Sequence, residues 1–213
     1  MTTLEYILNK YGIVLDGKKM PVDIPNTDRS HSLTGLWKEL GFKVGAEIGV
    51  EQGIFSKQIL EGNPGVKLFC VDASQAYHGY REHVNQEKLN SFYEITKQRT
   101  SGHDCILVRK FSVDAARDFK DGSLDFVYID ANHEFSQVVA DLSAWVPKVR
   151  IGGIISGHDF LRRKPSGYQV HVVEAVYGYT SAYRVSPWFL LGAKEFKDGE
   201  LRDRPRSYMW VRQ

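Results

Sequence analysis

The chain has 213 residues, of which 42% are hydrophobic, and its 28 lysines and arginines nearly balance its 26 aspartates and glutamates. This length is typical of a single domain that buries a core without disulfides. A net charge of +2, with no stripe of basic and aromatic residues, excludes an obvious nucleic-acid-binding protein.

The ends of the chain and its cysteine content indicate where the protein works. The amino-terminal residues lack the basic and apolar regions of a signal peptide, and no apolar stretch approaches the roughly 18 residues that cross a bilayer. Cys70 and Cys105 are too few for a disulfide framework. We therefore expect a cytoplasmic protein with no membrane partner.

Short apolar runs alternate with helical patterns along the middle of the chain. This alternation predicts right-handed crossovers and an α/β fold with a doubly wound, mostly parallel sheet covered by helices on both faces. The expected strands are 43–48, 66–71, 105–108, 124–129 and 152–156, and the expected helices follow Gly53 and cover 80–100, 113–119 and 135–146. Two later runs, 188–191 and 208–211, have no helix between them and predict an antiparallel hairpin at one edge of the sheet.

Residues 1–30 differ from this pattern. They hold a short helical stretch and then a turn-rich segment with two prolines. We interpret 1–30 as an appendage, either a lid over a ligand pocket or simple surface packing, and 31–213 as the main domain.

A glycine-rich loop follows the first predicted strand. Gly49 and Gly53 stand between that strand and a helix, where the backbone must turn tightly and approach a ligand closely. Gly45, Gly49 and Gly53 are spaced by four, unlike the glycines of dinucleotide-binding folds, which disfavours a nicotinamide dehydrogenase. Asp72 ends the second strand, where a carboxylate can accept hydrogen bonds from both hydroxyls of a ribose. Together these features predict a ligand that contains a nucleoside.

Two histidine–aspartate sets follow the fourth and fifth predicted strands. Asp130 and His133 come after one strand, and His158 and Asp159 end the next. Ligands bind outside the carboxyl ends of the strands in open α/β sheets, so these four side chains are expected to converge beside the nucleoside.

The segment E-I-G-V-E-Q-G-x-F-S, residues 47–56, resembles the first motif of class I S-adenosylmethionine-dependent methyltransferases. The resemblance extends over about residues 35–213 and implies a seven-stranded, Rossmann-like sheet that ends in an antiparallel hairpin. It implies that the glycine loop wraps the methionine part of S-adenosylmethionine and that Glu47 orients its amino group. Asp72 would bind the ribose, and the turn 112–114 would lie near the adenine. The cofactor-binding residues implied in this way are Glu47, Gly49, Glu51, Gly53, Asp72, Ala73, Ser112 and Asp130.

The motifs I-D-x-x-H and G-G-x-x-x-x-H-D resemble a branch of that family that includes catechol-type and macrolide-sugar O-methyltransferases. In that branch the acids matching Asp130 and Asp159 ligate magnesium. Phe160 departs from the catechol-type pattern, because it stands in the place of a third ligand, so two readings remain open. Either Mg²⁺ binds at the two aspartates, or Asp130 contacts the cofactor or acceptor directly. A histidine would suit a softer metal than magnesium.

Removal of a proton from an acceptor hydroxyl requires a base, and an imidazole titrates near neutral pH. His133 is the first candidate for this base and His158 the second, whereas a cap of the following helix is the alternative role for His133. The catalytic candidates are thus His133, His158 and Asp130.

The resulting hypothesis is a methyltransferase that acts on a hydroxyl of a small molecule, either a sugar or an aromatic alcohol, with or without a divalent cation. Transfer to nitrogen and a non-catalytic S-adenosylmethionine-binding module are the alternatives. The sequence leaves the acceptor unidentified and a homo-oligomer open.

Overall fold

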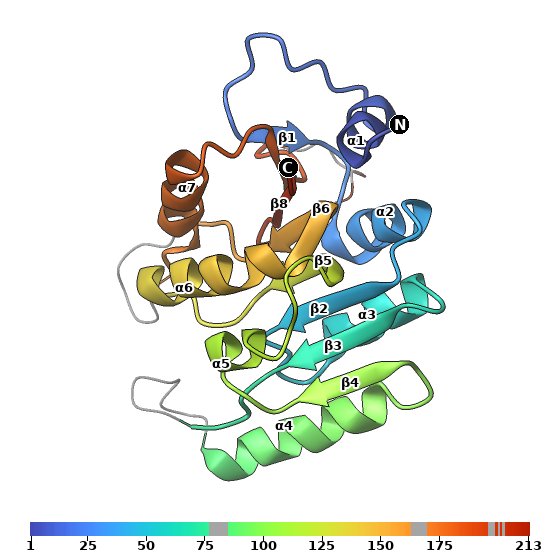
Figure 1. The fold of residues 1–213 in the computed structure, drawn as a ribbon, viewed down its shortest axis with the longest axis vertical. Helices are drawn as coiled ribbons and strands as arrows, with labels where there is room; N and C mark the ends of the chain where they lie inside the picture. The colour runs from blue at the N-terminus through green and yellow to red at the C-terminus, as the bar shows by residue number, and fades with distance from the viewer. Residues whose placement is uncertain (77–84, 163–169, 196–198, 200, 202) are drawn as a thin grey trace.

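The computed structural model describes residues 1–76, 85–162, 170–195, 199, 201 and 203–213, which form one α/β unit (Figure 1). Its sheet has eight strands in the order β1-β7-β8-β6-β5-β2-β3-β4. The strands are β1 (Val22–Ile24), β2 (Val44–Ile48), β3 (Lys67–Val71), β4 (Cys105–Val108), β5 (Leu124–Ile129), β6 (Val149–Gly157), β7 (Trp188–Leu191) and β8 (Tyr208–Val211). The helices are α1 (Thr3–Lys10), η1 (Arg29–Leu33), α2 (Thr34–Glu39), α3 (Ile54–Gly62), α4 (Gln86–Arg99), α5 (Ser112–Ala116), α6 (Phe135–Trp145), η2 (Val146–Lys148) and α7 (Val172–Ala182).

The direction of winding reverses in the middle of the sheet. From β2 the chain steps through β3 to β4 at one edge, whereas β5 lies on the other side of β2 and pairs with β6. All of these pairs are parallel, so the carboxyl ends of β2 and β5 lie side by side at the point of reversal. Ligand crevices in open α/β sheets form at such a point.

The predicted hairpin is present, but it does not form the edge of the sheet. Strand β8 pairs antiparallel with both β6 and β7, and β1 then adds to β7 in parallel. The sheet therefore has eight strands where seven were expected. A strand of only three residues is too short for an alternating pattern to reveal it in the sequence.

Each face of the sheet carries its own buried layer. Helices α5, α6 and α7 cover one face, where Trp145 is fully buried, and α1, α2 and α3 cover the other, where Trp37 is fully buried. Trp37 stacks on Phe126 of β5, with ring centroids 4.0 Å apart. A side chain on Gly45 of β2 would meet the same ring at 2.1 Å. The first glycine of the spacing therefore serves packing of the core and not the ligand loop.

The predicted central strands agree with the observed ones to within one residue, except that β6 begins at Val149. Helix α5 is shorter than predicted, and α4 begins at Gln86, with part of the predicted 80–100 segment outside the described residues. Helices α2 and α7 were not predicted from the sequence. Helix α7 is rich in β-branched and aromatic residues, which favour strands, and it becomes helical because it packs on α6.

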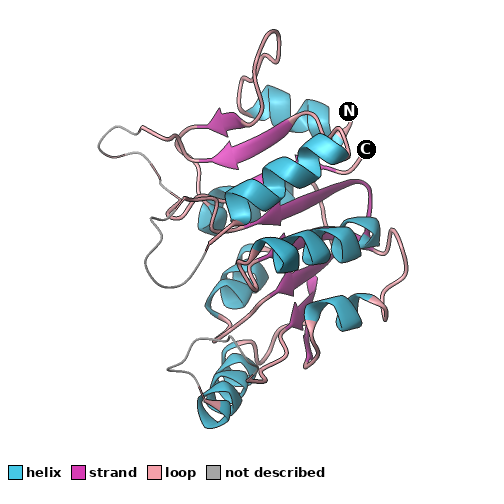
Figure 2. Cartoon of the chain, turned by 90° about the vertical axis from the view of Figure 1, so that its left-hand side faces the viewer, coloured by secondary structure: helices cyan, strands magenta, loops and turns pink. Residues whose placement is uncertain are grey.

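The amino-terminal segment is tied to the sheet. The hydroxyl of Thr3 donates to the carbonyl of Gly152 at 2.6 Å, and the Gly152 amide donates to the carbonyl of Arg212 at 2.8 Å. The two chain termini consequently lie at the same end of the molecule, as both views show (Figures 1 and 2).

Two further expectations concern the cysteines and membrane spans. Cys70 and Cys105 are free thiols on neighbouring strands, with sulfur atoms 3.3 Å apart. Within the described residues, no helix combines the length and the apolar character needed to cross a bilayer.

Candidate functional site

A cavity of about 840 Å³ opens at the carboxyl ends of the central strands. Its volume is within the range of small-molecule sites. The cavity is lined by every predicted site residue except Gly53: Glu47, Gly49, Glu51, Asp72, Ala73, Ser112, Asp130, His133, His158 and Asp159. Residues that the sequence assigned to two separate functions therefore share one continuous space.

Gly49 brings the ends of β2 and β5 into contact. Its φ of +86° lies in the left-handed region, and an added Cβ would sit 2.1 Å from the carbonyl oxygen of Asp130. Gly53 has a different role, because an added Cβ there would meet Thr96 of α4 at 2.9 Å. One glycine thus shapes the cavity wall, and the other permits packing of α4 behind the loop.

Asp72 holds the glycine loop in place. Its Oδ2 accepts hydrogen bonds from the backbone amides of Val50 and Glu51, both at 3.0 Å, and its Oδ1 accepts one from the amide of Ser74 at 2.7 Å. The carboxylate also lines the cavity. This positioning of the loop could not be predicted from the sequence, because a hydrogen bond across two strand ends leaves no local pattern.

Glu47 forms part of the cavity wall although only 2% of the residue is exposed. The hydroxyl of Ser56 donates a hydrogen bond to it. Burial raises the pKa of Glu47 to about 8, a shift that the Ser56 hydrogen bond only partly opposes. A positively charged ligand group beside Glu47 would favour the ionised carboxylate.

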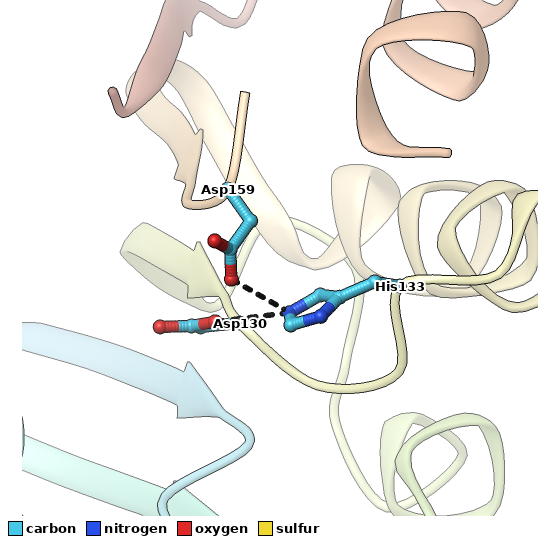
Figure 3. A group of neighbouring side chains, drawn as sticks. All are labelled: Asp130, His133 and Asp159. Atoms are coloured by element: carbon cyan, nitrogen blue, oxygen red, sulfur yellow. Dashed lines mark hydrogen bonds and ion pairs between the residues drawn. The ribbon is translucent and has the colours of Figure 1, made fainter. Parts of the chain in front are cut away.

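The two histidine–aspartate sets form one cluster, of which Figure 3 shows Asp130, His133 and Asp159. The Nε2 atom of His133 lies 3.0 Å from Oδ2 of Asp159 and 3.4 Å from Oδ1 of Asp130. The Nδ1 atom of His158 lies 3.4 Å from Oδ2 of Asp130 and 3.5 Å from Oδ2 of Asp159. Each carboxylate is therefore shared by both imidazoles, as expected for the ends of neighbouring parallel strands.

These contacts determine the charges of the cluster. Burial opposes ionisation of Asp130, but hydrogen bonds with the two histidines outweigh it and lower the pKa to about 2. The pKa of Asp159 is lowered well below its usual range by the same balance. Burial also disfavours the charged imidazoles, yet the two carboxylates raise the pKa of His133 and of His158 to about 9. Two negative and two positive charges thus face one another at neutral pH.

Arg29 is a site residue that the sequence analysis did not single out. It begins η1, in the segment read as an appendage, and its Nη1 lies 3.6 Å from Oδ2 of Asp130 and 3.4 Å from the hydroxyl of Tyr128. Its guanidinium lies over the ring of Phe55, 5.3 Å from the centroid. Arg29 lines the cavity, so the amino-terminal segment contributes to the site.

The side chains at the end of β6 point in opposite directions. Asp159 has a φ of +54°, which is uncommon for a residue other than glycine, and its carboxylate faces the cluster. Phe160 is buried instead, and its ring packs on Trp188 with centroids 5.7 Å apart. The third donor beside the two aspartates is His133, because one ligand atom of each of these three residues lies within 4.8 Å of the other two.

Comparison with known proteins identifies the family. Residues 46–160, which are more than half of the chain, match the family model described as a methyltransferase domain. The chain belongs to this methyltransferase family. The matched segment begins in β2 and ends just after β6, and it includes the glycine loop and the histidine–aspartate cluster.

Solved structures share the fold of this methyltransferase domain. An O-methyltransferase from Bacillus cereus in complex with SAH is 16% identical, with a TM-score of 0.60 over 99% of this chain and 90% of that one. The O-methyltransferase TomG from Streptomyces achromogenes in complex with SAM is 15% identical, with a TM-score of 0.57 over 85% of this chain and 78% of that one. The predicted methyltransferase family and its Rossmann-like fold are confirmed by the domain family and the solved structures together.

A curated relative is much longer than this methyltransferase domain. The uncharacterized protein y4gI of Sinorhizobium fredii (strain NBRC 101917 / NGR234) is 24% identical over 141 residues. These cover 61% of this chain but only 14% of that protein.

Proposed function

We propose that this protein transfers a methyl group from S-adenosylmethionine to a hydroxyl of a small molecule. The observation that carries this proposal is that one cavity joins a glycine loop held by Asp72 to a buried histidine–aspartate cluster. A nucleoside donor suits the first part, and a group that must lose a proton suits the second.

The donor is assigned to the walls formed by β2, β3 and β4. Asp72 lines the cavity, and a ribose hydroxyl there would take the place of the Ser74 hydroxyl, which donates to Oδ1 at 3.2 Å. Glu47 is buried next to the loop and suits the methionine ammonium. The amino terminus of α3 follows the loop and favours the donor's carboxylate. This placement leaves the methyl group facing the cluster at the ends of β5 and β6.

The acceptor hydroxyl is assigned to the cluster, with His133 as its proton acceptor. Asp159 fixes the ring of His133 by the shortest contact of the cluster, at 3.0 Å. A base requires a neutral imidazole, whereas the two carboxylates hold His133 protonated. His133 therefore loses its proton, and can act as the base, only when another positive charge neutralises Asp130 and Asp159.

A divalent cation fits this requirement. Asp130 and Asp159 offer carboxylate oxygens to such a cation. Where Nε2 of His133 is the third ligand, the mixed set suits Mn²⁺ better than Mg²⁺, and His158 then takes the role of the base. A cation held there would polarise an acceptor hydroxyl and lower its pKa. Arg29, which lies near Asp130, provides positive charge at the same carboxylate.

Titration calorimetry with S-adenosylhomocysteine tests the donor site. We expect micromolar binding by the intact protein, and replacement of Asp72 with alanine should weaken it by roughly tenfold to hundredfold, because both the ribose and the loop lose an ionised partner. Asp104→Ala, at the opposite end of the sheet, serves as the control and should bind normally. Equal affinity of the Asp72 variant and the intact protein contradicts the ribose assignment.

Replacement of His133 with alanine tests the acceptor site. Turnover of a hydroxylated acceptor should fall by about 10²- to 10⁴-fold, while the affinity for S-adenosylhomocysteine stays within about threefold. His158→Ala measures the contribution of the second imidazole. Full activity of both variants would favour a nitrogen acceptor, which needs no base, and binding without turnover of any acceptor would favour a non-catalytic module.

The cellular compartment, the role of residues 1–30 and the oligomeric state are further parts of the proposal. Free thiols at Cys70 and Cys105 suit a reducing compartment such as the cytoplasm. A lid role for residues 1–30 is supported by Arg29 and Ser30, which line the cavity. A homo-oligomer remains a prediction.

A further inference from the structure

A buried carboxylate from α6 lies at the end of the cavity that the sequence analysis assigned to adenine. Only 4% of Asp141 is exposed, yet it lines the cavity together with Gln137, one helical turn earlier on the same face of α6. Ser112 and Val113, from the turn after β4, line the same cavity. Asp141 thus brings a negative charge to this turn from a different element.

The acid within the turn itself is directed elsewhere. Oδ1 of Asp114 pairs with Nη1 of Arg117 at 2.8 Å, and 58% of the Asp114 side chain is exposed. Asp114 is also not among the residues that line the cavity. Near Ser112, Asp141 is therefore the carboxylate that a ligand can reach.

The surroundings of Asp141 leave it able to accept a hydrogen bond. The indole Nε1 of Trp145 donates to the hydroxyl oxygen of Ser112 at 2.8 Å, which leaves the Ser112 hydrogen for Asp141. Burial raises the pKa of Asp141 to about 6, and the bond with Ser112 only partly offsets this, so the group is mostly ionised at neutral pH. Within the described part of the chain, no basic side chain forms an ion pair with it. An ionised carboxylate only accepts, and a buried one favours a ligand that brings an N–H donor.

We propose that Asp141 accepts a hydrogen bond from the 6-amino group of the adenine and thereby selects adenine over purines that lack this group. The inference deepens the proposed function and rests on it, because it requires a nucleoside donor in this cavity. A purine without the amino group would displace water from the carboxylate of Asp141 and offer no N–H donor in its place. The unpaired carboxylate would then weaken the binding of that purine.

Calorimetry with two ligands tests the assignment. One ligand is S-adenosylhomocysteine, and the other is its analogue with hydrogen in place of the 6-amino group. The intact protein should bind the first roughly tenfold to hundredfold more tightly, as expected for a hydrogen bond to a charged group. Asp141→Ala should reduce this preference to within about threefold, mainly by weakening the binding of S-adenosylhomocysteine.

Two further variants complete the experiment. Asp141→Asn preserves the volume and one acceptor oxygen, so it should fold normally and reduce the preference at least about threefold through loss of charge. Asp114→Asn removes the exposed acid of the turn and should leave the preference unchanged. A preference near one in the intact protein, or an undiminished preference in either Asp141 variant, overturns the assignment. Absence of any binding of S-adenosylhomocysteine to the intact protein overturns the proposed function as well, so the two failures are distinguishable.

Discussion

Replacement of Gly49 with alanine should abolish measurable binding of S-adenosylhomocysteine, with a loss of affinity of at least ~100-fold. The new Cβ would lie 2.1 Å from the carbonyl oxygen of Asp130 and 2.6 Å from Cα of Ala131, both of which are backbone atoms. Neither atom can move without displacing the end of β5. The ends of β2 and β5 must therefore separate, and the loss of about 2–3 kcal/mol of contacts between the loop and the ligand corresponds to roughly this factor. Calorimetry measures the affinity.

A matched variant separates the clash from the cost of backbone conformation. Gly102 has a φ of +84°, close to the +86° of Gly49, but an added Cβ there meets nothing within 4 Å. Both alanine variants should lose about 1–2 kcal/mol of unfolding free energy from the left-handed conformation, as measured by urea unfolding. Only the Gly49 variant should lose further stability, by about 1–3 kcal/mol, together with its ligand binding. Normal binding by the Gly49 variant refutes the close approach of the loop to the donor.

Replacement of Asp130 with asparagine should reduce turnover by about 10²- to 10⁴-fold. Asp130 is the carboxylate shared by His133, His158 and Arg29, so its charge organises the whole cluster. Asparagine retains the size of the side chain but offers one weaker acceptor, which leaves buried positive charges without a full partner. The affinity for S-adenosylhomocysteine should fall much less than turnover, because the glycine loop and Asp72 remain intact.

Binding of Mn²⁺ provides an independent measurement on the same variant. Electron paramagnetic resonance should detect bound Mn²⁺ in the intact protein and little or none in the Asp130 variant. Asp121→Asn is a suitable control, since Asp121 pairs with Lys148 outside the cavity. Loss of turnover without any Mn²⁺ binding by the intact protein would favour direct contact of Asp130 with the acceptor. Unchanged turnover would exclude Asp130 from the reaction.

Much of the central sheet could be predicted from the sequence. All residues of β5 except Asp125 are hydrophobic and buried, and such a segment is typical of a strand covered on both faces. The order of strands and helices then fixes which ends meet. This explains why Asp130, His133, His158 and Asp159 were expected to converge and do so in the structure.

Other parts of the site depend on contacts between segments that are distant in the sequence. Arg29 reaches Asp130 only because the segment before it adds β1 to the sheet, and three residues are too few to predict that strand. Asp141 was absent from the sequence analysis for a related reason. In the sequence, an acidic residue within an amphipathic helix is expected to lie at the surface. The packing of α6 over the strand ends instead makes Asp141 part of the cavity wall.

Local patterns along the chain and the handedness of crossovers are enough to predict the α/β class, the glycine loop, the ends of the central strands and the motif that marks the methyltransferase family. The directions of the side chains around the cavity follow instead from packing in three dimensions. This packing turned Asp159 inward and Phe160 into the core, directed Asp114 to solvent, and paired the carboxylates with the histidines. Those outcomes depend on which surfaces become buried together, and that is decided when the layers pack.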